Sequence, residues 1–364
     1  MNGKKVYVGM SGGVDSSVSA ALLKEQGFDV TGVFIRVWQP DWMECTWRED
    51  RLDAMRVCVH LGIPFLTLDL EKEYKKEVVD YMVSEYKAGR TPNPDVMCNR
   101  YVKFGGFFDW AMARGADYIA TGHYAQVLPR RNLGNDYRGF ASVELGMGAD
   151  RSKDQSYFLW TLSQRELVRI LFPVGGMAKS ETRGLAARFR LPVAEKRDSQ
   201  GLCFIGKVDI KEFLSHYIEL KKGKVLDEEG TVIGEHDGAA FLTVGERHGF
   251  TVANKTADGR PYYVVSRNLS RNEVVVSHRS SDGALSTEKT AYRVSSCNWI
   301  SGDPNGSTAL LARIRHLGEL VPCRVQVTGE GEAVFKFDRP IMAASGQSLV
   351  VYDGETCLGG GIVV

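Results

Sequence analysis

Hydrophobic and polar positions follow two alternating patterns through the first half of the chain. Short apolar runs rich in β-branched and aromatic residues, typical of buried strands, alternate with segments whose apolar residues recur every three or four positions, typical of helices. The patterns predict strands at 4–8, 31–38, 64–70 and 116–123 and helices at 16–27, 51–62, 73–89 and 103–115. This alternation predicts an α/β fold with a doubly wound parallel sheet.

The pattern changes near Lys207. Residues 208–219 form one amphipathic helical segment, and short β-branched runs separated by Gly, Asp and Asn turns follow it. Many short strands at regular spacing predict a small closed barrel at the C-terminal end. We therefore predict a catalytic α/β domain at 1–206, a small central α+β domain at 207–284 and a C-terminal β-barrel at 285–364.

The stretch VGMSGGVDSS, residues 8–17, joins the first predicted strand to the first predicted helix. Gly12 and Gly13 let the backbone approach a ligand closely. The N–H groups of the first helical turn, together with the hydroxyls of Ser11 and Ser16, favour an anion such as phosphate. The alternative is a glycine turn with polar caps that starts an ordinary helix.

This loop lacks the Gly-Lys-Ser/Thr end of a Walker A loop and carries the acid Asp15 instead. A carboxylate beside a polyphosphate repels it unless a cation stands between them, so we expect Mg²⁺ at Asp15. The stretch SGGVDS resembles the pyrophosphate loop of ATP-pyrophosphatases, which cleave ATP between its α- and β-phosphates.

Composition and charge limit the class of protein. The chain has 43% hydrophobic and 25% charged residues and a net charge of +1, and no apolar run approaches the roughly 18 residues of a membrane helix. The N-terminus leads directly into a strand, so we expect no signal peptide and a cytoplasmic protein. Any nucleic acid would be held by a local patch, such as 179–207 with seven Lys or Arg against three acids, although a solvated helix face has the same composition.

The seven cysteines are widely spaced and form no CxxC pair, which argues against a disulfide framework or a zinc ribbon. Cys98 lies in the proline loop 89–104, which precedes a predicted helix, so the helix dipole lowers its thiol pKa. Asp95 lies three residues earlier and can exchange a proton with a reacting base. Cys203 lies between two glycines and among basic residues, a flexible and electropositive surrounding that a reactive thiolate needs. The alternatives are a buried core cysteine and a linker cysteine without a role.

Taken together, GMSGGVDSS, KAGRTPNPDVMCN, ADYIATGHYA, RSKDQSYFLW, LFPVG, RDSQGLCFIG and CLGGGI resemble the bacterial tRNA-specific 2-thiouridylase family. The resemblance covers nearly the whole chain, in order. It implies that ATP adenylates the 2-oxygen of the wobble uridine in tRNA and that a persulfide sulfur then displaces AMP. It also implies a persulfide-bearing donor protein as a partner, and no membrane partner.

The resemblance assigns roles by motif. Cys203 carries the persulfide, Cys98 is the partner thiol and nucleophile, and Asp95 is the acid/base. The ATP-binding residues are Gly9, Met10, Ser11, Gly12, Gly13, Val14, Asp15, Ser16, Ile35 and Gly122. The tRNA-binding residues are Asn93, Pro94, Asp95, His123, Lys153, Asp154, Gln155, Arg315, His316 and Gln347. The family has Met and Asn in the second strand where this chain has IRVWQP, which bears on the adenine contact through Ile35.

Two other functions remain open on the residues alone. A second ATP-pyrophosphatase reaction would adenylate a small carboxylate or ureido group and need neither cysteine. A non-catalytic RNA-binding module would use nucleotide binding as a sensor and the cysteines as a redox switch. Measuring pyrophosphate release separates the three functions. Release that depends on tRNA supports the tRNA 2-thiouridylase, release with a small metabolite supports the second enzyme, and no release supports the non-catalytic module.

Overall fold

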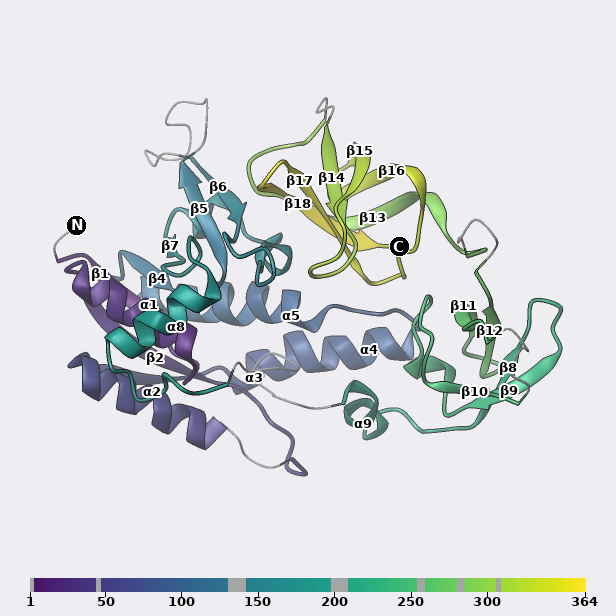
Figure 1. The fold of residues 1–364 in the computed structure, drawn as a ribbon, viewed down its shortest axis with the longest axis horizontal. Helices are drawn as coiled ribbons and strands as arrows, with labels where there is room; N and C mark the ends of the chain where they lie inside the picture. Colours follow the sequence, from purple (N-terminus) through teal and green to yellow (C-terminus); the bar gives the residue numbers. More distant parts are fainter. Residues whose placement is uncertain are drawn as a thin grey trace.

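The computed structural model describes residues 3–43, 47–129, 142–197, 209–253, 259–279, 285–305 and 309–364. Within them the chain forms a parallel sheet flanked by helices, a small antiparallel-rich central sheet and a C-terminal barrel (Figure 1). No helix in these ranges is long and apolar enough to span a bilayer.

The parallel sheet confirms the predicted doubly wound fold. Its strands are β1 (Lys5–Gly9), β2 (Asp29–Arg36), β3 (Phe65–Asp69), β4 (Tyr118–Ala120) and β7 (Ile170–Leu171). Their order is β3-β2-β1-β4-β7, so the connections reverse direction between β1 and β4. In open α/β sheets ligands bind at such a reversal, beyond the carboxyl ends of the strands.

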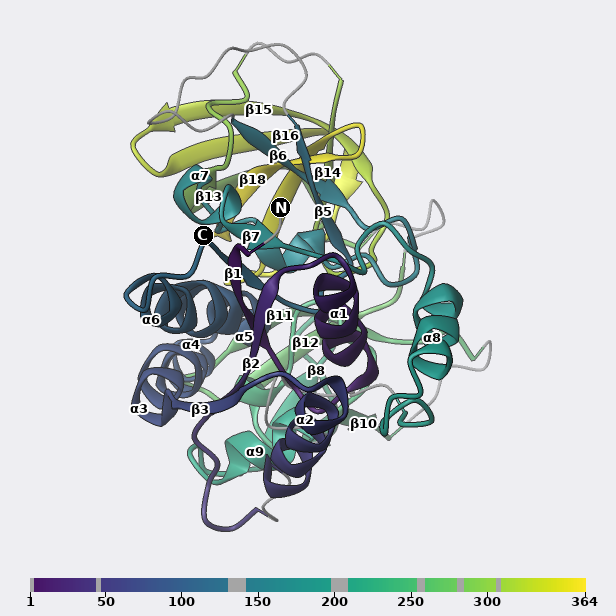
Figure 2. The ribbon, with the colours of Figure 1, turned by 90° about the vertical axis from the view of Figure 1, so that its left-hand side faces the viewer.

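Two helical layers cover the sheet (Figure 2). One layer holds α1 (Val14–Glu25), α2 (Trp47–Leu61) and α8 (Lys179–Arg188). The other holds two long helical segments, α3 (Glu71–Tyr74), η1 (Lys75–Asp80) and α4 (Tyr81–Lys87), then α5 (Pro94–Met97), η2 (Cys98–Phe107) and α6 (Phe108–Met112). Val6 and Val8 of β1 pack in the first layer and Tyr7 in the second, as strand alternation requires.

The second long helical segment begins at Pro94, nine residues before the predicted start at 103, and therefore includes Cys98. Asn93 caps it by accepting a hydrogen bond from the Val96 N–H at 3.2 Å, and proline suits the first helical turn. Its middle, η2, is π-helical, a rare winding often found at functional sites. A Cβ at Gly105 would lie 2.8 Å from the Arg100 carbonyl oxygen, so glycine permits this winding.

A β-hairpin that the pattern did not predict connects the sheet domain to the barrel. Strands β5 (Ala125–Pro129) and β6 (Val143–Met147) pair with each other, and β6 also pairs with β18 of the barrel. Short elements follow it: η3 (Ser156–Leu159) and α7 (Gln164–Leu167), where Ser163 and Glu166 form a capping box, as their three-residue spacing in the sequence indicates.

The C-terminal barrel is closed, as predicted. Its strands are β13 (Lys289–Trp299), β14 (Leu310–Arg313), β15 (Val321–Gly329), β16 (Glu332–Ile341), β17 (Ser348–Asp353) and β18 (Thr356–Val363). The order β13-β16-β15-β14-β17-β18 returns to β13 through the β13–β18 pairing. Closure removes the exposed sheet edges.

The central region is an α+β unit. It contains α9 (Ile210–Ser215), η4 (Ala239–Phe241) and a sheet of β8 (Gly223–Leu226), β9 (Val232–His236), β10 (Phe250–Val252), β11 (Tyr263–Asn268) and β12 (Glu273–Ser277). Its own small core is mostly valine. The predicted domain boundaries after 206 and 284 both lie outside the described residues and stay predictions.

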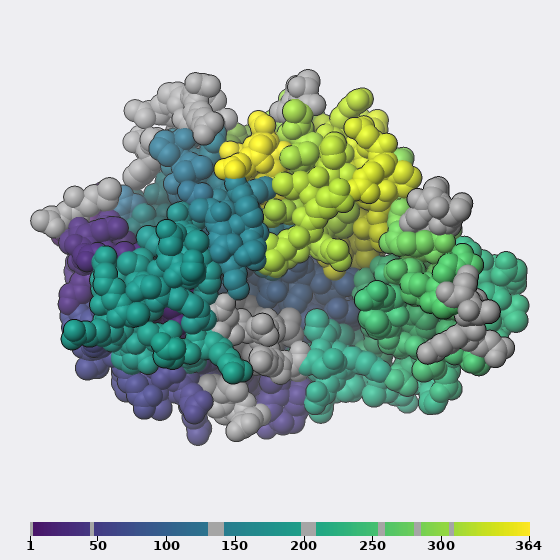
Figure 3. Space-filling view, viewed as in Figure 1, coloured from purple at the N-terminus to yellow at the C-terminus, as the bar shows by residue number. Residues whose placement is uncertain are grey.

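Both C-terminal units contact the turn that leads into the α5 helix. Figure 3 shows the yellow barrel and the green central unit side by side, with blue atoms of the sheet domain between and behind them. Arg267 of β11 donates to the Gly89 carbonyl at 2.8 Å, and the Thr91 N–H donates to the Ser345 carbonyl at 2.8 Å. A Cβ at Gly346 would lie within 3.0 Å of Thr91 backbone atoms, so the barrel packs closely there. The placement of Asn93 and the start of α5 therefore depends on all three units.

Candidate active site

The loop between β1 and α1 forms a bare helix N-terminus. Gly12 has φ +72°, and a Cβ there would collide with the Asp50 carbonyl of α2, so only glycine fits. Gly13 is the N-cap residue and has no side chain to occupy the first-turn amides. These amides are therefore available to an anion, as the sequence predicts.

Serine hydroxyls hold this loop together from inside. The Ser11 and Ser16 hydroxyls lie 3.1 Å apart, and the Ser16 hydroxyl also accepts the Ser11 N–H at 3.2 Å. Ser17 and Ser19 donate to the carbonyls of Gly13 and Asp15. The loop is thus preorganised before any ligand arrives, which favours binding.

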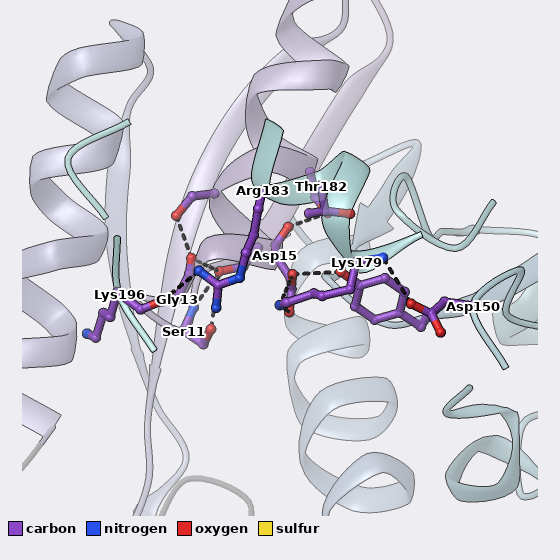
Figure 4. Close-up of polar contacts among 12 residues, drawn as sticks. Ser11, Gly13, Asp15, Asp150, Lys179, Thr182, Arg183 and Lys196 are labelled. Carbon is purple, nitrogen blue, oxygen red and sulfur yellow. Dashed lines mark hydrogen bonds and ion pairs between the residues drawn. The ribbon is translucent and has the colours of Figure 1, made fainter. Parts of the chain in front are cut away.

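Asp15 contacts a cation that the sequence reading did not assign. Lys179, the first residue of α8, places its ammonium 2.7 and 2.8 Å from the two Asp15 carboxylate oxygens (Figure 4). The Tyr124 hydroxyl donates to the same carboxylate at 2.9 Å. Lys179 is only 13% exposed and Asp15 29%, so this is a largely enclosed pair. The sequence placed Lys179 in a basic stretch for RNA, and only the tertiary fold brings it to the phosphate loop.

This arrangement does not fit a magnesium cage built by the protein. Both Asp15 oxygens already receive the Lys179 ammonium, and no group of three acidic, His or Cys side chains that could hold a metal occurs in the described part of the chain. Lys179 supplies a positive charge opposite Asp15. The expected Mg²⁺ at Asp15 therefore stays a prediction that these contacts do not support.

Helix α8 also presents Arg183 to the site (Figure 4). Its guanidinium donates to the Lys196 carbonyl at 3.2 Å and lies on the loop side of the helix. The α8 N-terminus is fixed by a hydrogen bond of 3.0 Å from the Lys179 N–H to the Asp150 carboxylate. One helix therefore delivers two cations to the phosphate loop.

Gly122 lies against the N-terminus of α1. A Cβ there would lie 2.6 Å from the Ser16 nitrogen, so the chain leaving β4 touches the first turn of α1. The sequence places Gly122 among the ATP-binding residues, and the structure brings it to the phosphate loop. The Ile35 side chain is buried in β2, beside Leu68 of β3. Only the backbone of Ile35 can therefore face a ligand at the sheet edge.

His123 is buried and partnered. Its Nδ1 lies 2.7 Å from the Thr121 hydroxyl and its Nε2 3.4 Å from the Lys103 ammonium, with Phe104 and Phe172 beside the ring. Burial, and then the Lys103 charge, hold the pKa of His123 well below its ordinary value, so the ring is neutral. As a tRNA contact His123 stays a prediction; in this structure it places Lys103 at the exit of β4.

The residues implied for the target base lie together at the start of the α5 helix. Asn93 and Asp95 are half-buried, and Cys98 is fully buried. Helices of a doubly wound fold run antiparallel to the strands they precede, so this N-terminus lies beyond the carboxyl edge that also holds the phosphate loop. Cys203 lies outside the described residues, so its distance from Cys98 stays untested.

The chain just before the Cys203 segment is anchored near the loop. The Lys196 ammonium lies 2.8 Å from the Asp50 and 2.7 Å from the Asp53 carboxylate. Burial alone would lower the pKa of Lys196, but the hydrogen bonds to both acids outweigh burial and raise it. The Asp50 carbonyl also packs on Gly12. The phosphate loop and the chain at Lys196 therefore both contact Asp50 of α2.

The implied tRNA residues divide into exposed and buried groups. Lys153 and Gln155 are partly exposed, although the Gln155 side-chain oxygen accepts the Tyr124 N–H at 2.9 Å. Asp154 is fully buried, accepts hydrogen bonds from the Gly148 and Ser156 N–H groups and pairs with Arg313 of the barrel. Its position supports the 150–156 turn and offers no surface to RNA in this structure.

The remaining implied tRNA residues lie at the barrel. Arg315 is exposed, and the His316 ring packs at a tilt against Phe158 with ring centroids 4.4 Å apart. Burial lowers the pKa of His316. Arg315 and Gln347 line a cavity of about 1070 Å³ between the barrel, the central unit and Tyr86 of α4. The sequence reading could not have joined these surfaces, because three units form them.

Three family models together match most of the chain. Residues 4–207 match a tRNA methyl transferase HUP domain, 211–278 a tRNA methyl transferase PRC-barrel domain, and 289–363 an aminomethyltransferase beta-barrel domain. The first of these covers more than half of the chain.

Full-length relatives carry a different description. The tRNA-specific 2-thiouridylase MnmA of Bacillus velezensis is 43% identical over 366 residues, covering 99% of this chain and 94% of the relative. The protein of the same description from Francisella philomiragia is 41% identical and covers both chains fully. Among solved structures, a U34-tRNA thiolase NcsA from Methanococcus maripaludis is 18% identical with a TM-score of 0.36, covering 59% of this chain and 64% of that one.

Proposed function

Because this chain belongs to the tRNA-specific 2-thiouridylase family, we propose that it is a tRNA-uridine 2-sulfurtransferase that converts the wobble uridine of tRNA to 2-thiouridine. One observation carries the proposal. A preformed phosphate loop, faced by Lys179, lies at the carboxyl edge of the sheet, and the helix that Asn93 caps extends beyond this edge from Lys103, which contacts His123. A nucleotide and a nucleobase can therefore meet there.

The first step is activation of the base by ATP. The uracil 2-oxygen attacks the α-phosphorus, the bond between α- and β-phosphates breaks, and pyrophosphate leaves. The first-turn amides of α1, with Lys179 and Arg183 of α8, stabilise the charge on the leaving pyrophosphate. ATP arrives as its Mg²⁺ complex, a form that needs no metal cage in the protein.

A wobble base stacked in the anticodon cannot reach this edge, so it is splayed out of the loop. Asn93, Pro94 and Asp95 hold it at the α5 N-terminus. Asp95 is the acid/base there. Gly122 and the backbone end of Ile35 bound the nucleotide side of the same pocket.

The second step transfers sulfur. A persulfide-bearing donor protein loads Cys203. The terminal persulfide sulfur attacks C2 of the adenylated base and AMP leaves with the former 2-oxygen. The Cys98 thiolate then attacks the Cys203 sulfur, which breaks the S–S bond to the base and releases 2-thiouridine. A Cys98–Cys203 disulfide remains. An external thiol reductant supplies the two electrons that reduce this disulfide before the next turnover.

Binding of tRNA would combine Lys153 and Gln155 with Arg315, His316 and Gln347 at the barrel. Lys and Arg contacts with phosphates make the affinity fall steeply with salt, and loss of one contact flattens the salt slope by about one unit. The reaction belongs in the cytoplasm because its substrates, tRNA and ATP, are found there.

The central experiment measures pyrophosphate release and thiolated uridine with purified protein, tRNA, ATP and a persulfide donor. We expect pyrophosphate release to depend on tRNA and 2-thiouridine to form only when the donor is present. Release with a small metabolite in place of tRNA would favour another ATP-pyrophosphatase reaction. A methylated base formed from a methyl donor, without ATP cleavage, would favour the activity named in the family-model descriptions.

The cysteine roles are tested by variants supplied with labelled persulfide. Cys203→Ser is expected to adenylate tRNA without transferring sulfur. Cys98→Ser is expected to load label on Cys203 and stall there. Label on Cys98 alone would reverse the two roles, and full thiolation by either variant would remove that cysteine from the mechanism.

A further inference from the structure

We propose that Asn99 selects uracil at the wobble position by accepting a hydrogen bond from the N3–H of the base. This inference rests on the proposed function, because it places the base at the start of the α5 helix. It adds a specificity-determining residue beside the residues assigned by motif.

The Asn99 side chain is buried and half satisfied. It is only 3% exposed. Its Nδ2 donates to the Asp95 carbonyl at 3.0 Å, whereas its Oδ1 has no hydrogen-bond partner in the described structure. A buried acceptor without a donor costs about 1–3 kcal/mol, so a ligand that supplies the donor gains that free energy.

The Nδ2 contact also sets where the oxygen lies. Asp95 is four residues earlier, so the amide bends back toward the helix start. There it lies alongside Asp95 and next to Cys98, the two residues proposed to act on the base. The π-helical winding begins at Cys98 and replaces the regular α-helical hydrogen-bond pattern there. The Asn99 side-chain amide donates a hydrogen bond to the Asp95 carbonyl at the point where the α-helix changes to the π-helix.

The chemistry distinguishes the two pyrimidines. Uracil carries N–H at position 3, whereas cytosine carries a bare acceptor nitrogen. Flipping the Asn99 amide to suit cytosine would bring Oδ1 against the Asp95 carbonyl, so the amide is locked with Nδ2 on that carbonyl and Oδ1 left as the unpaired acceptor. A site built to bond a substrate N–H rejects analogues that lack it far more strongly than a shape-only pocket does.

The experiment compares binding of tRNAs that carry uridine, cytidine or 3-methyluridine at the wobble position, using the full-length enzyme. Affinity is measured by fluorescence anisotropy, with tRNA-dependent pyrophosphate release in parallel. We expect the wild-type enzyme to prefer uridine about 10- to 100-fold over each analogue. In Asn99→Ala that preference should fall to within about threefold, mainly through weaker uridine binding.

Two further variants keep the test decisive. Asn298 of β13 donates through its amide to the Trp160 and Leu162 carbonyls and not to the α5 helix, so Asn298→Ala should retain the wild-type preference. Asn99→Leu keeps the approximate volume but removes both amide atoms, so it should lose the preference as the alanine variant does, and it substitutes for that variant if alanine does not fold. An unchanged preference in Asn99→Ala, or none in the wild type, would overturn the proposal.

Failure of this inference and of the proposed function give different results. If wild-type enzyme releases pyrophosphate with uridine tRNA and Asn99→Ala keeps its full discrimination, only the role of Asn99 is wrong. If wild-type enzyme releases none with any tRNA, the proposed function itself is wrong.

Discussion

At the scale of single residues, ionisable side chains are placed by contacts that their sequence neighbours do not reveal. Asp15 lies at a helix N-terminus, where a carboxylate is favoured, yet the side chains of Lys179 and Tyr124 both donate hydrogen bonds to its carboxylate. His123 follows a strand at a ligand-binding edge, yet its ring is buried beside Phe104. Substitutions at the two residues therefore test different properties. A substitution at Asp15 tests nucleotide chemistry, and one at His123 tests how stability depends on pH.

Replacing Asp15 by Asn should abolish activation while leaving the fold intact. The substitution keeps the size of the side chain but removes the charge that holds Lys179 over the loop, so we expect tRNA-dependent pyrophosphate release to fall at least about 100-fold. The free energy of unfolding should fall by about 1–3 kcal/mol, because the largely enclosed Lys179 ammonium loses its carboxylate partner. Pyrophosphate assays and urea denaturation measure the two effects. Near-normal release with matched stability would refute the role of Asp15.

Replacing His123 by Gln should weaken the acid sensitivity of the fold. The folded-state pKa lies below the ~6.5 of an unfolded chain, so between these values only the unfolded state binds the proton. The stabilisation is full above pH ~6.5 and is lost as the pH falls toward the folded-state value, by at most ~1.4 kcal/mol per pH unit. Urea midpoints of wild type and variant from pH 7.5 to pH 5 should therefore converge at the acid end, and parallel curves would contradict this.

At the scale of elements, the α1 N-terminus is built by close backbone approach from two neighbours. Gly12 admits the Asp50 carbonyl of α2, and Gly122 admits the first turn of α1 to the exit of β4. The loop has little freedom because backbone, and not flexible side chains, faces each glycine. A single methyl group at either position must therefore displace a whole element.

Gly122→Ala should impair nucleotide binding more than it impairs the fold. Its Cβ would lie 2.6 Å from the Ser16 nitrogen and 2.8 Å from the Asp15 carbonyl carbon, so β4 and α1 must separate at the phosphate site. We expect ATP affinity to fall at least tenfold, with about 1–3 kcal/mol lost in stability. Gly184→Ala is a matched control, because a Cβ on that exposed-side α8 position meets nothing within 4 Å. Equal ATP affinity in both variants would contradict the assignment.

At the scale of the whole molecule, buried polar contacts join the sheet domain to the barrel. Asp154 and Arg313 form an ion pair with side chains 0% and 7% exposed, and Tyr157 donates to the Ile314 and Ser348 carbonyls at 3.0 Å. The β6–β18 pairing adds backbone hydrogen bonds to the same junction. We therefore expect the sheet domain and the barrel to unfold together.

Breaking the Asp154–Arg313 pair should be costly and non-additive. Arg313→Met leaves a fully buried carboxylate without its cation, which costs about 3–5 kcal/mol. Combining it with Asp154→Asn removes the uncompensated charge, so the double variant should be more stable than Arg313→Met alone. Denaturant unfolding of the four proteins measures this coupling. A strictly additive pair of losses would mean that the two side chains act independently.

The sequence by itself determined the features that depend on neighbours in the chain. The strand, the two glycines and the helix of residues 4–27 predict the phosphate loop, Ser163 and Glu166 predict their capping box, and the short C-terminal strands predict the barrel. The predicted start at 103 was nine residues late, because Asn93 caps the helix and Pro94 stands in its first turn.

Only the tertiary structure decided which distant groups meet. Lys179 reaches Asp15 across 164 positions, Arg313 reaches Asp154 across 159, and β6 finds its second partner in β18. Such contacts depend on how the sheet, the central unit and the barrel pack, which leaves no periodic signal in the chain. Asn99 belongs to the same class, because its unpaired oxygen exists only once the surrounding helix and core have excluded water.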